Sequence, residues 1–183
     1  RGPLSAEEGD NASAIELDGV SSFTLMQSTV TAEAGHGIMS TATGSDGVLI
    51  SGVTFNSIRN TALSATDALG SWTISGNVSK GPIGEHGVAF NGGDARVSVS
   101  INRFEEVNSD AMRASNALGS WTISGNVSKG PIGGDGISIA GGHTESSMVI
   151  TANQFERIDG NGISAQDALG AWTISGNVSR GPI

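Results

Sequence analysis

The sequence predicts an all-β solenoid, a parallel β-helix of about seven coils with roughly 25 residues and three short strands in each coil. The segment ALGSWTISGNVSKGPIG occurs at 68–84, again letter for letter at 117–133, and as a near copy at 168–183. Apolar residues in and around these copies alternate with Ser and Thr, which indicates strands with one buried face. The 28 glycines and the 15% of charged residues favour short strands and tight turns over a helical core.

The length of one coil follows from the asparagine of WTISGNV. This residue is Asn77, Asn126 and Asn177 in the three copies, and the intervening segments VSVSINRF and SMVITANQF place Asn102 and Asn153 in the same register. Successive members of this series are separated by 25, 24, 27 and 24 residues. The three long repeats are therefore every second coil of a stack in which each coil buries its apolar face against its neighbours.

Each coil has three apolar segments that we expect to point inward. The first strands contribute Ile38, Leu63, Val88, Met112, Ile137 and Ile163. The second strands contribute the pairs Phe23/Leu25, Val48/Ile50, Trp72/Ile74, Val97/Val99, Trp121/Ile123, Met148/Ile150 and Trp172/Ile174. The third segments are expected to contribute Val30, Phe55, Val78, Phe104, Val127, Phe155 and Val178.

The tryptophans indicate how the core is packed. Trp72, Trp121 and Trp172 share a predicted column with smaller residues in the alternate coils. Because stacked strands are about 4.8 Å apart, a Trp in every coil would overfill this column. Large residues alternating with small ones bring such a core to native packing density.

The asparagines predict a second, polar column. An inward Asn at a coil corner can bond backbone groups that the bend leaves unpaired, and can also bond the amide of the next coil. We expect Asn77, Asn102, Asn126, Asn153 and Asn177 to form this stack.

The recurring register I-[ST]-x-N-x-F resembles that of the right-handed parallel β-helix superfamily of pectate-lyase-like proteins, over essentially all 183 residues. The resemblance implies a single-stranded, right-handed β-helix with an Asn stack at the turn between the second and third strands. It also implies that any chemistry is carried by Asp, Lys, Arg or His on the outward face of the strands. The superfamily includes lyases, hydrolases and epimerases acting on polysaccharides, so the resemblance is specific for fold and not for function.

Composition excludes several classes of function. The net charge is −9 and the nine Lys and Arg residues are scattered singly, so no basic patch is predicted to bind nucleic acid. The absence of cysteine excludes disulfides and thiolate metal sites. No apolar run approaches the ~20 residues needed to span a bilayer. An acidic, Cys-free chain rich in Gly, Ser, Thr and Asn is typical of extracellular or cell-surface proteins of bacteria and archaea.

The outward strand positions do not predict catalysis. Outward first-strand residues are Met39, Ser64, Ala89, Arg113, Ser138 and Ser164, and those of the second strand are mostly Ser and Thr. Sugar chemistry by general acid and base uses two placed carboxylates, or a base beside a calcium-binding acidic cluster, and neither appears. We therefore predict no enzyme activity, no catalytic residue and no cofactor, with a polysaccharide-binding or polysaccharide-degrading β-helix as the alternative.

Two weaker candidates lie on the surface. His36 and His86 occupy equivalent corners two coils apart, about 10 Å, which is too far for them to share a metal ion. Asp110 and Asp135 follow in the same column, together with Asn161, and are a weak candidate for a Ca²⁺ site. The competing interpretation is that these residue types suit turn geometry.

A possible surface-binding stripe is formed by hydroxyl residues of the second strands. Its members in the three copies are Thr73, Ser75, Thr122, Ser124, Thr173 and Ser175. Regular T-x-T arrays on flat solenoids order water in ice-binding proteins, so ice binding is a minor alternative. A polar, solvated strand face explains the stripe equally well.

We expect residues 1–183 to form one β-helix domain, either a segment of a longer repeat array or a stackable subunit. The chain begins with RGPL and ends with SRGPI, so both ends are expected to lie at the same phase of a coil. The predicted function is structural or adhesive: an adhesin stalk, or a filament subunit that assembles end to end. The expected partners are a second copy, flanking β-helix coils, or glycans and cell surfaces.

Overall fold

The computed structural model describes residues 4–5, 12–41, 44–116 and 118–180, and these form three parallel sheets. Sheet A contains β1 (Leu4–Ser5), β4 (Thr29–Ala32), β7 (Thr54–Ile58), β10 (Val78–Ser79), β13 (Arg103–Phe104), β16 (Val127–Ile132), β19 (Gln154–Ile158) and β22 (Val178–Arg180). Sheet B contains β2 (Ile15–Leu17), β5 (Ile38–Ser40), β8 (Leu63–Ala68), β11 (Val88–Gly93), β14 (Met112–Ser115), β17 (Ile137–Ala140) and β20 (Ile163–Gln166). Sheet C contains β3 (Ser21–Met26), β6 (Asp46–Ser51), β9 (Ser71–Ser75), β12 (Arg96–Ser100), β15 (Ser120–Ser124), β18 (Ser147–Thr151) and β21 (Ala171–Ser175).

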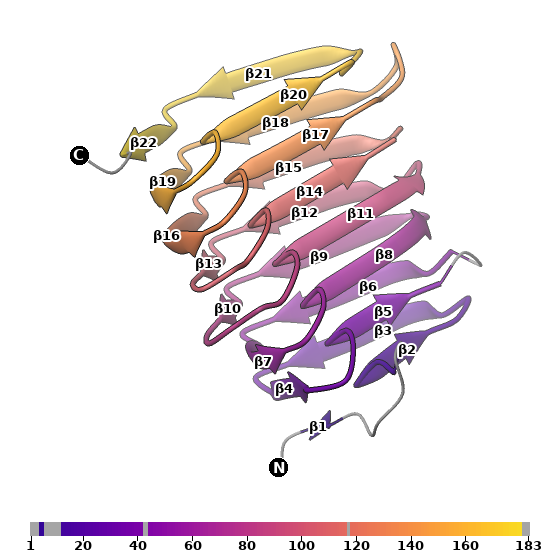
Figure 1. The fold of residues 1–183 in the computed structure, drawn as a ribbon. Coiled ribbons are helices and arrows are strands. Elements are labelled where there is room, and N and C mark those ends of the chain that lie inside the picture. Colours follow the sequence, from indigo (N-terminus) through magenta and orange to yellow (C-terminus); the bar gives the residue numbers. More distant parts are fainter. Residues whose placement is uncertain (1–3, 6–11, 42–43, 117, 181–183) are drawn as a thin grey trace.

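The chain visits the sheets in the order B, C, A and then begins the next coil, so each strand pairs with the strand three places along the sequence. Figure 1 shows the resulting stack of coils, with the first coils and the last coils at opposite ends of one axis. The structure confirms the predicted solenoid of about seven coils, because the register of every sheet repeats at the predicted period.

The inward column of sheet C that contains the tryptophans alternates large and small side chains, as predicted. Val97 pairs with Trp72 on one side and with Trp121 on the other, and Met148 lies between Trp121 and Trp172. Trp72 and Trp121 are buried, and the indole N–H of Trp72 donates to the carbonyl oxygen of Ser45 at 3.0 Å. The large rings are therefore spaced two coils apart, and each sits over a smaller side chain.

The predicted third column is wrong in the coils that contain WTISGNVS. Ser79 pairs with both Phe55 and Phe104, and Ser128 pairs with Phe104 and Phe155, whereas Val78 and Val127 lie in the adjoining row. Aligned on the asparagine, NVS therefore places Ser, and not Val, opposite the Phe of N-x-F. The column alternates Phe with buried Ser, which is a second large-and-small alternation.

The Phe rings also explain a glycine that precedes a first strand. A Cβ built on Gly87 would lie 2.5 Å from Cδ1 of Phe104, closer than real Cβ contacts. The ring occupies the space that a side chain at residue 87 would need. In two of the coils where Ser takes the place of Phe, the equivalent positions hold Ala62 and Ala111, and the last such coil has Gly162.

The amino-terminal end differs from the expected phase. Leu4 pairs with Val30 and so lies in the row of Phe55 and Ser79, whereas the isoleucine of the GPI segment, Ile83, bridges Ile58 and Val107 in a different row. Leu4 therefore does not occupy the place that Ile83 occupies in the inner coils, and the rest of the predicted match, residues 1–3 and 181–183, lies outside the described residues.

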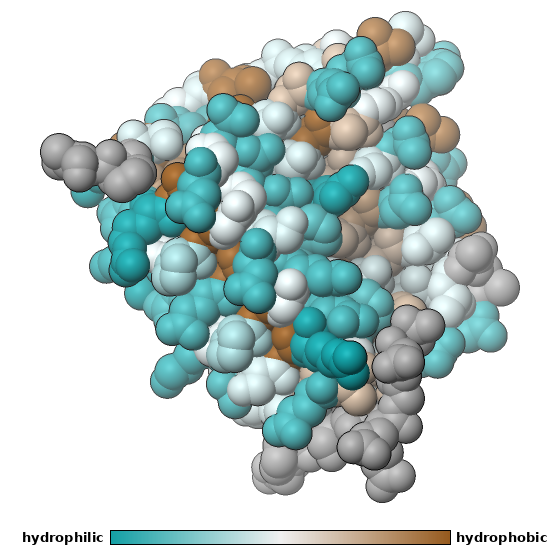
Figure 2. Space-filling model, in the orientation of Figure 1, coloured by the Kyte–Doolittle hydropathy of each residue, from teal (hydrophilic) through white to brown (hydrophobic). Residues whose placement is uncertain are grey.

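The outer surface follows from the same period-two alternation. Figure 2 shows a mostly hydrophilic face with scattered apolar residues. Within the described residues, no helix is long and apolar enough to cross a bilayer.

Candidate functional site

The outer face of sheet B carries a groove with a volume of about 820 Å³. Its floor is formed by outward side chains of the sheet B strands, and its two rims by the corner residues before and after those strands. The floor residues are Ser64, Ala89, Asn91, Arg113, Ser115, Ala140 and Gln166. The rim before the strands includes His36, Thr61, Glu85 and His86, and the rim after them includes Asn116, Gly141 and Asp167.

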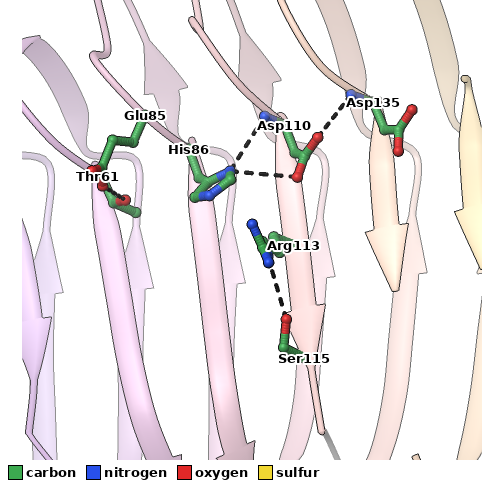
Figure 3. Close-up of polar contacts among 7 residues, drawn as sticks. All are labelled: Thr61, Glu85, His86, Asp110, Arg113, Ser115 and Asp135. Atoms are coloured by element: carbon green, nitrogen blue, oxygen red, sulfur yellow. Dashed lines mark hydrogen bonds and ion pairs between the residues drawn. The ribbon is translucent and has the colours of Figure 1, made fainter. Parts of the chain in front are cut away.

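One rim belongs to a column of residues that each lie two positions before a sheet B strand, here called the corner column (Figure 3). Its members are His36, Thr61, His86, Asp110, Asp135 and Asn161. Several of them accept a hydrogen bond from the backbone N–H of the next coil. Nδ1 of His36 accepts from Thr61 N at 3.3 Å, and Nδ1 of His86 accepts from Asp110 N at 3.3 Å. The corner column therefore ties neighbouring coils together.

His86 is the one described residue whose pKa clearly departs from its ordinary value. Burial lowers its pKa, and Arg113 lowers it further, while Asp110 and Glu85 act in the opposite direction. The imidazole is therefore neutral at pH 7. Because the N–H of Asp110 donates to Nδ1, the neutral ring carries its proton on Nε2. Nε2 can then donate a hydrogen bond to a ligand in the groove, and it cannot act as a base.

The carboxylates of the corner column are also used for holding the coils together. Oδ1 of Asp110 accepts from Asp135 N at 2.8 Å, and Oδ1 of Asp135 accepts from Asn161 N at 2.6 Å. Oδ2 of Asp110 lies 3.5 Å from Nδ1 of His86, a contact that becomes an ion pair only when the imidazole is protonated.

The predicted Ca²⁺ candidate is therefore a pair of carboxylates that already have partners. Ca²⁺ takes about six to eight oxygen ligands. One carboxylate oxygen of Asp110 and one of Asp135 already accept a hydrogen bond from a backbone N–H. Within the described part of the chain, no group of three or more His, Asp or Glu side chains is arranged to hold a metal ion.

The remaining charged groups of the groove lie beside these rungs (Figure 3). Oγ1 of Thr61 donates to Oε2 of Glu85 at 3.0 Å, which joins two successive coils. Nε of Arg113 lies 3.3 Å from Oγ of Ser115, on the same strand, and the Arg113 side chain is exposed. Arg113 is thus a fixed positive charge on the floor of the groove.

The predicted asparagines lie inside the solenoid, and the structure brings all of them into one column, the Asn column: Asn77, Asn102, Asn126, Asn153 and Asn177. Both the backbone N–H and Nδ2 of Asn77 donate to Oδ1 of Asn102, at 3.0 and 2.9 Å. Nδ2 of Asn77 also donates to the carbonyl oxygen of Ile50 at 3.0 Å. The same three bonds recur along the column as far as Asn153.

The hydroxyl stripe lies on the outer face of sheet C. Thr73 and Thr122 are exposed, and the column of Ser75 and Ser124 is half-buried. Oγ of Ser75 donates to Oγ of Ser51 at 3.4 Å. In the column of Thr73, Leu49 and Val149 interrupt the hydroxyl groups.

The sequence profile of the family described as the right handed beta helix region matches residues 13–181. The chain belongs to this family. Among solved structures, it is similar to the surface protein and adhesin PfbA of Streptococcus pneumoniae, with 14% sequence identity and a TM-score of 0.44 over 88% of this chain. The match spans about half (49%) of the length of that protein. Comparison with curated protein sequences gives no match.

Sequence reasoning missed the groove of this β-helix. It assigned one outward residue to each sheet B strand, Arg113 among them, and omitted the next outward row, which contains Asn91 and Gln166. The signal was present, because a strand of period two that points Ala89 outward must also point residue 91 outward. The rim residues Asn116 and Asp167 have positive φ, at 51° each. Their residue types indicate a turn, but they do not indicate that the side chains lie beside a groove.

Proposed function

We propose that this right-handed β-helix is a structural and adhesive element of an extracellular or cell-surface protein of a bacterium or archaeon. The observation that carries the proposal is the use made of the polar side chains. The side chains best suited to catalysis or metal binding accept hydrogen bonds from backbone N–H groups of the adjacent coil. They are His36, His86, Asp110 and Asp135, and these bonds stabilise the stack of coils. A rigid solenoid of this kind suits a stalk that holds a binding surface away from the cell.

The adhesive part of the proposal rests on the groove. Its floor offers hydrogen-bonding groups of Asn91, Gln166 and Ser115 together with the charge of Arg113. The neutral imidazole of His86 at the rim adds an N–H donor. Hydroxyl-rich and carboxylate-bearing glycans carry the acceptors that these donors fit. We therefore propose glycans of a cell surface as the partner of this face.

The test is binding of the purified chain to a panel of immobilised acidic and neutral glycans. Arg113→Ala should weaken binding of an acidic glycan at least about tenfold, since a charge-assisted hydrogen bond contributes roughly 1.5–3 kcal/mol. The matched control is Lys80→Ala, which removes an exposed positive charge outside the groove. Equal loss in both variants, or no binding to any glycan, overturns the adhesive assignment.

The alternative is a β-helix that cleaves the polysaccharide in the same groove. The observation that favours it is that His86 and Arg113 line the same groove. An observation against it is that Nε2 of the neutral His86 carries the proton, so His86 cannot act there as the base. The same glycans should be incubated with the chain and analysed for new unsaturated ends. Their appearance, and their loss in Arg113→Ala, would replace the adhesive proposal with a lyase.

A further inference from the structure

The corner that joins a sheet B strand to the following sheet C strand carries an exposed leucine in coils that contain tryptophan (Figure 1). Leu69 and Leu118 each lie three positions before the tryptophan of their coil, and their side chains are 45% and 46% exposed. Both coils have a neighbouring coil on either side, so their exposure is unrelated to the ends of the stack. The two leucines are therefore an apolar feature of the side of the rod.

The coil between the two leucines places a carboxylate in the same row. Asp94 is exposed and lies three positions before Val97, which pairs with the tryptophans of both adjacent coils. Because stacked strands are about 4.8 Å apart, this row presents apolar, acidic and apolar side chains at steps of that length. Leu69, Asp94 and Leu118 are here called the leucine ridge.

A hollow of about 370 Å³ opens beside the acidic member of the leucine ridge. Asp94 lines it together with Asp46, Ser71, Arg96 and Ser120. Within the described part of the chain, Arg96 forms an ion pair with neither Asp94 nor Asp46. The hollow therefore offers a carboxylate to a cationic side chain that enters it between the two leucines.

The neighbouring coils hold the leucine ridge in place. The N–H of Leu118 donates to the carbonyl oxygen of Gly93 at 2.9 Å, and its carbonyl oxygen accepts from Oγ of Ser146 at 2.8 Å. The side chain of Leu69 lies against Gly44, where an added Cβ would be 2.8 Å from Cδ1 of the leucine. A partner that binds a surface ordered in advance loses less conformational entropy.

The spacing of the leucine ridge matches one face of an α-helix. Helix residues i, i+3 or i+4, and i+7 share a face, and they lie at about 0, 4.5–6 and 10.5 Å along the axis. The three ridge positions lie at about 0, 4.8 and 9.6 Å. An extended strand returns to one face every ~6.6 Å, and a polyproline helix returns every ~9.3 Å with no residue of that face midway. A helix is therefore the element whose side chains meet all three positions.

Charge indicates what that helix carries. Two exposed carboxylates, those of Asp46 and Asp94, face one cation, Arg96, among the described residues that line the hollow. The exposed Asp67 precedes Leu69 by two positions and adds to the negative charge of the corner. Two copies of this acidic surface would repel each other, whereas a lysine or arginine flanked by apolar residues complements it.

We propose that the leucine ridge binds a basic amphipathic α-helix of a partner protein. Apolar residues at i and i+7 of that helix contact Leu69 and Leu118, and a lysine or arginine at i+3 or i+4 enters the hollow and pairs with Asp94. None of the three ridge residues lines the groove of sheet B. The inference therefore adds a protein partner and does not depend on glycan binding.

The test uses an alanine-rich peptide of about three heptads, with leucine at every seventh position and lysine four residues after each leucine. Fluorescence anisotropy of the labelled peptide gives its Kd for the full chain. Circular dichroism reports the gain of helix in the peptide, because the described part of the chain contains strands and no helix. One control peptide has glutamate in place of lysine. A second has each lysine directly after the leucine, where it no longer faces the ridge.

The lysine peptide should gain helix on binding and should bind at least about fivefold more tightly than either control peptide. Leu118→Ser should weaken its binding at least about fivefold, whereas Ile101→Ser, at an exposed residue of another corner, should change the Kd less than about twofold. No binding, binding without a gain of helix, or equal affinities for the three peptides overturns the proposal.

A charge exchange separates direct contact from a general effect of charge. Asp94→Lys should reverse the preference, so that the glutamate peptide binds more tightly than the lysine peptide. Asp159→Lys, at an exposed position outside the leucine ridge, should leave the preference for the lysine peptide unchanged. Equal behaviour of the two variants contradicts the proposal. So does sedimentation of the chain as a dimer that Leu118→Ser dissociates, because a second copy is then the occupant.

Discussion

The ring of Phe90 meets the ring of Trp121 edge-on, with centroids 4.9 Å apart and an interplanar angle of 86°. Phe90 makes the same kind of contact with Trp72, at 5.3 Å and 82°. Phe90 lies on sheet B and both tryptophans lie on sheet C, so one phenylalanine bridges the two large rings across the small residue Val97. The space that the small Val97 leaves between the two tryptophans of sheet C is thus filled by a side chain from sheet B.

Replacing this bridging ring should be costly. Phe90→Ala is expected to lower the free energy of unfolding by about 3–5 kcal/mol, because a large side chain leaves a cavity that its neighbours cannot fill. Phe90→Leu retains most of the volume and loses the two aromatic contacts, each of which contributes about 0.5–1.5 kcal/mol. Urea denaturation followed by tryptophan fluorescence measures both. A loss in Phe90→Ala no larger than in Phe90→Leu would show that the cavity closes.

A substitution in the Asn column should lower the free energy of unfolding at least as much. Asn126→Ala removes the acceptor for the N–H and Nδ2 of Asn102 and the donor to the carbonyl oxygen of Val99. Each buried polar group left unpaired costs about 1–3 kcal/mol, so a loss of several kcal/mol is expected. Asn108→Ala, at an exposed position of the preceding coil, should change the stability by less than about 0.5 kcal/mol. Similar losses in the two variants would contradict a buried polar role for Asn126.

One corner carries a residue that its backbone disfavours. The position before each asparagine has positive φ, and glycine occupies it in most coils, yet Ile101 has a φ of 57° and is 72% exposed. A β-branched residue in this conformation is strained by about 1–2 kcal/mol. Ile101→Gly should therefore raise the free energy of unfolding by about 0.5–1.5 kcal/mol, after the greater freedom of glycine in the unfolded chain is subtracted.

The reverse change provides the control for Ile101. Gly76 has a φ of 62°, and a Cβ added there meets no atom within 4 Å, so Gly76→Ile tests backbone strain without a steric clash. It should lower the stability by about 0.5–1.5 kcal/mol, because the strain is again partly offset by the lower freedom of isoleucine in the unfolded chain. Thermal unfolding followed by circular dichroism compares the pair. If Ile101→Gly is destabilising, the exposed isoleucine makes a stabilising contact that the conformational argument omits.

The sequence predicted the columns better than the groove for a physical reason. Burial imposes period two and a fixed coil length, so the positions of Trp121 and Asn126 follow from alternation and spacing. Val78 was assigned to the wrong row because both Val and Ser are compatible with a short third strand, and only alignment on Asn77 decides between them. The groove depends on corner residues such as Asp167, whose direction is set by turn conformation and not by periodicity.

The titration of His86 links the groove rim to stability. Because the pKa of the folded-state imidazole lies below the unfolded value of about 6.5, the unfolded chain binds more protons between the two values. The contribution of His86 is therefore complete above pH 6.5 and is lost as the pH falls towards the folded-state pKa. The free energy of unfolding should decrease between pH 7 and pH 5, and part of this decrease should come from His86.

His86→Asn isolates that part. The amide oxygen can accept the N–H of Asp110 as Nδ1 does, and asparagine already occupies this column at Asn161, but the side chain does not titrate. The variant should retain more of its pH 7 stability at pH 5 than the parent chain. His143→Asn, at an exposed histidine outside the corner column, is the matched control for replacing a histidine with asparagine. Denaturation curves at the two pH values decide the matter, because an identical decrease in parent and His86→Asn would mean that protonation of His86 does not destabilise the fold.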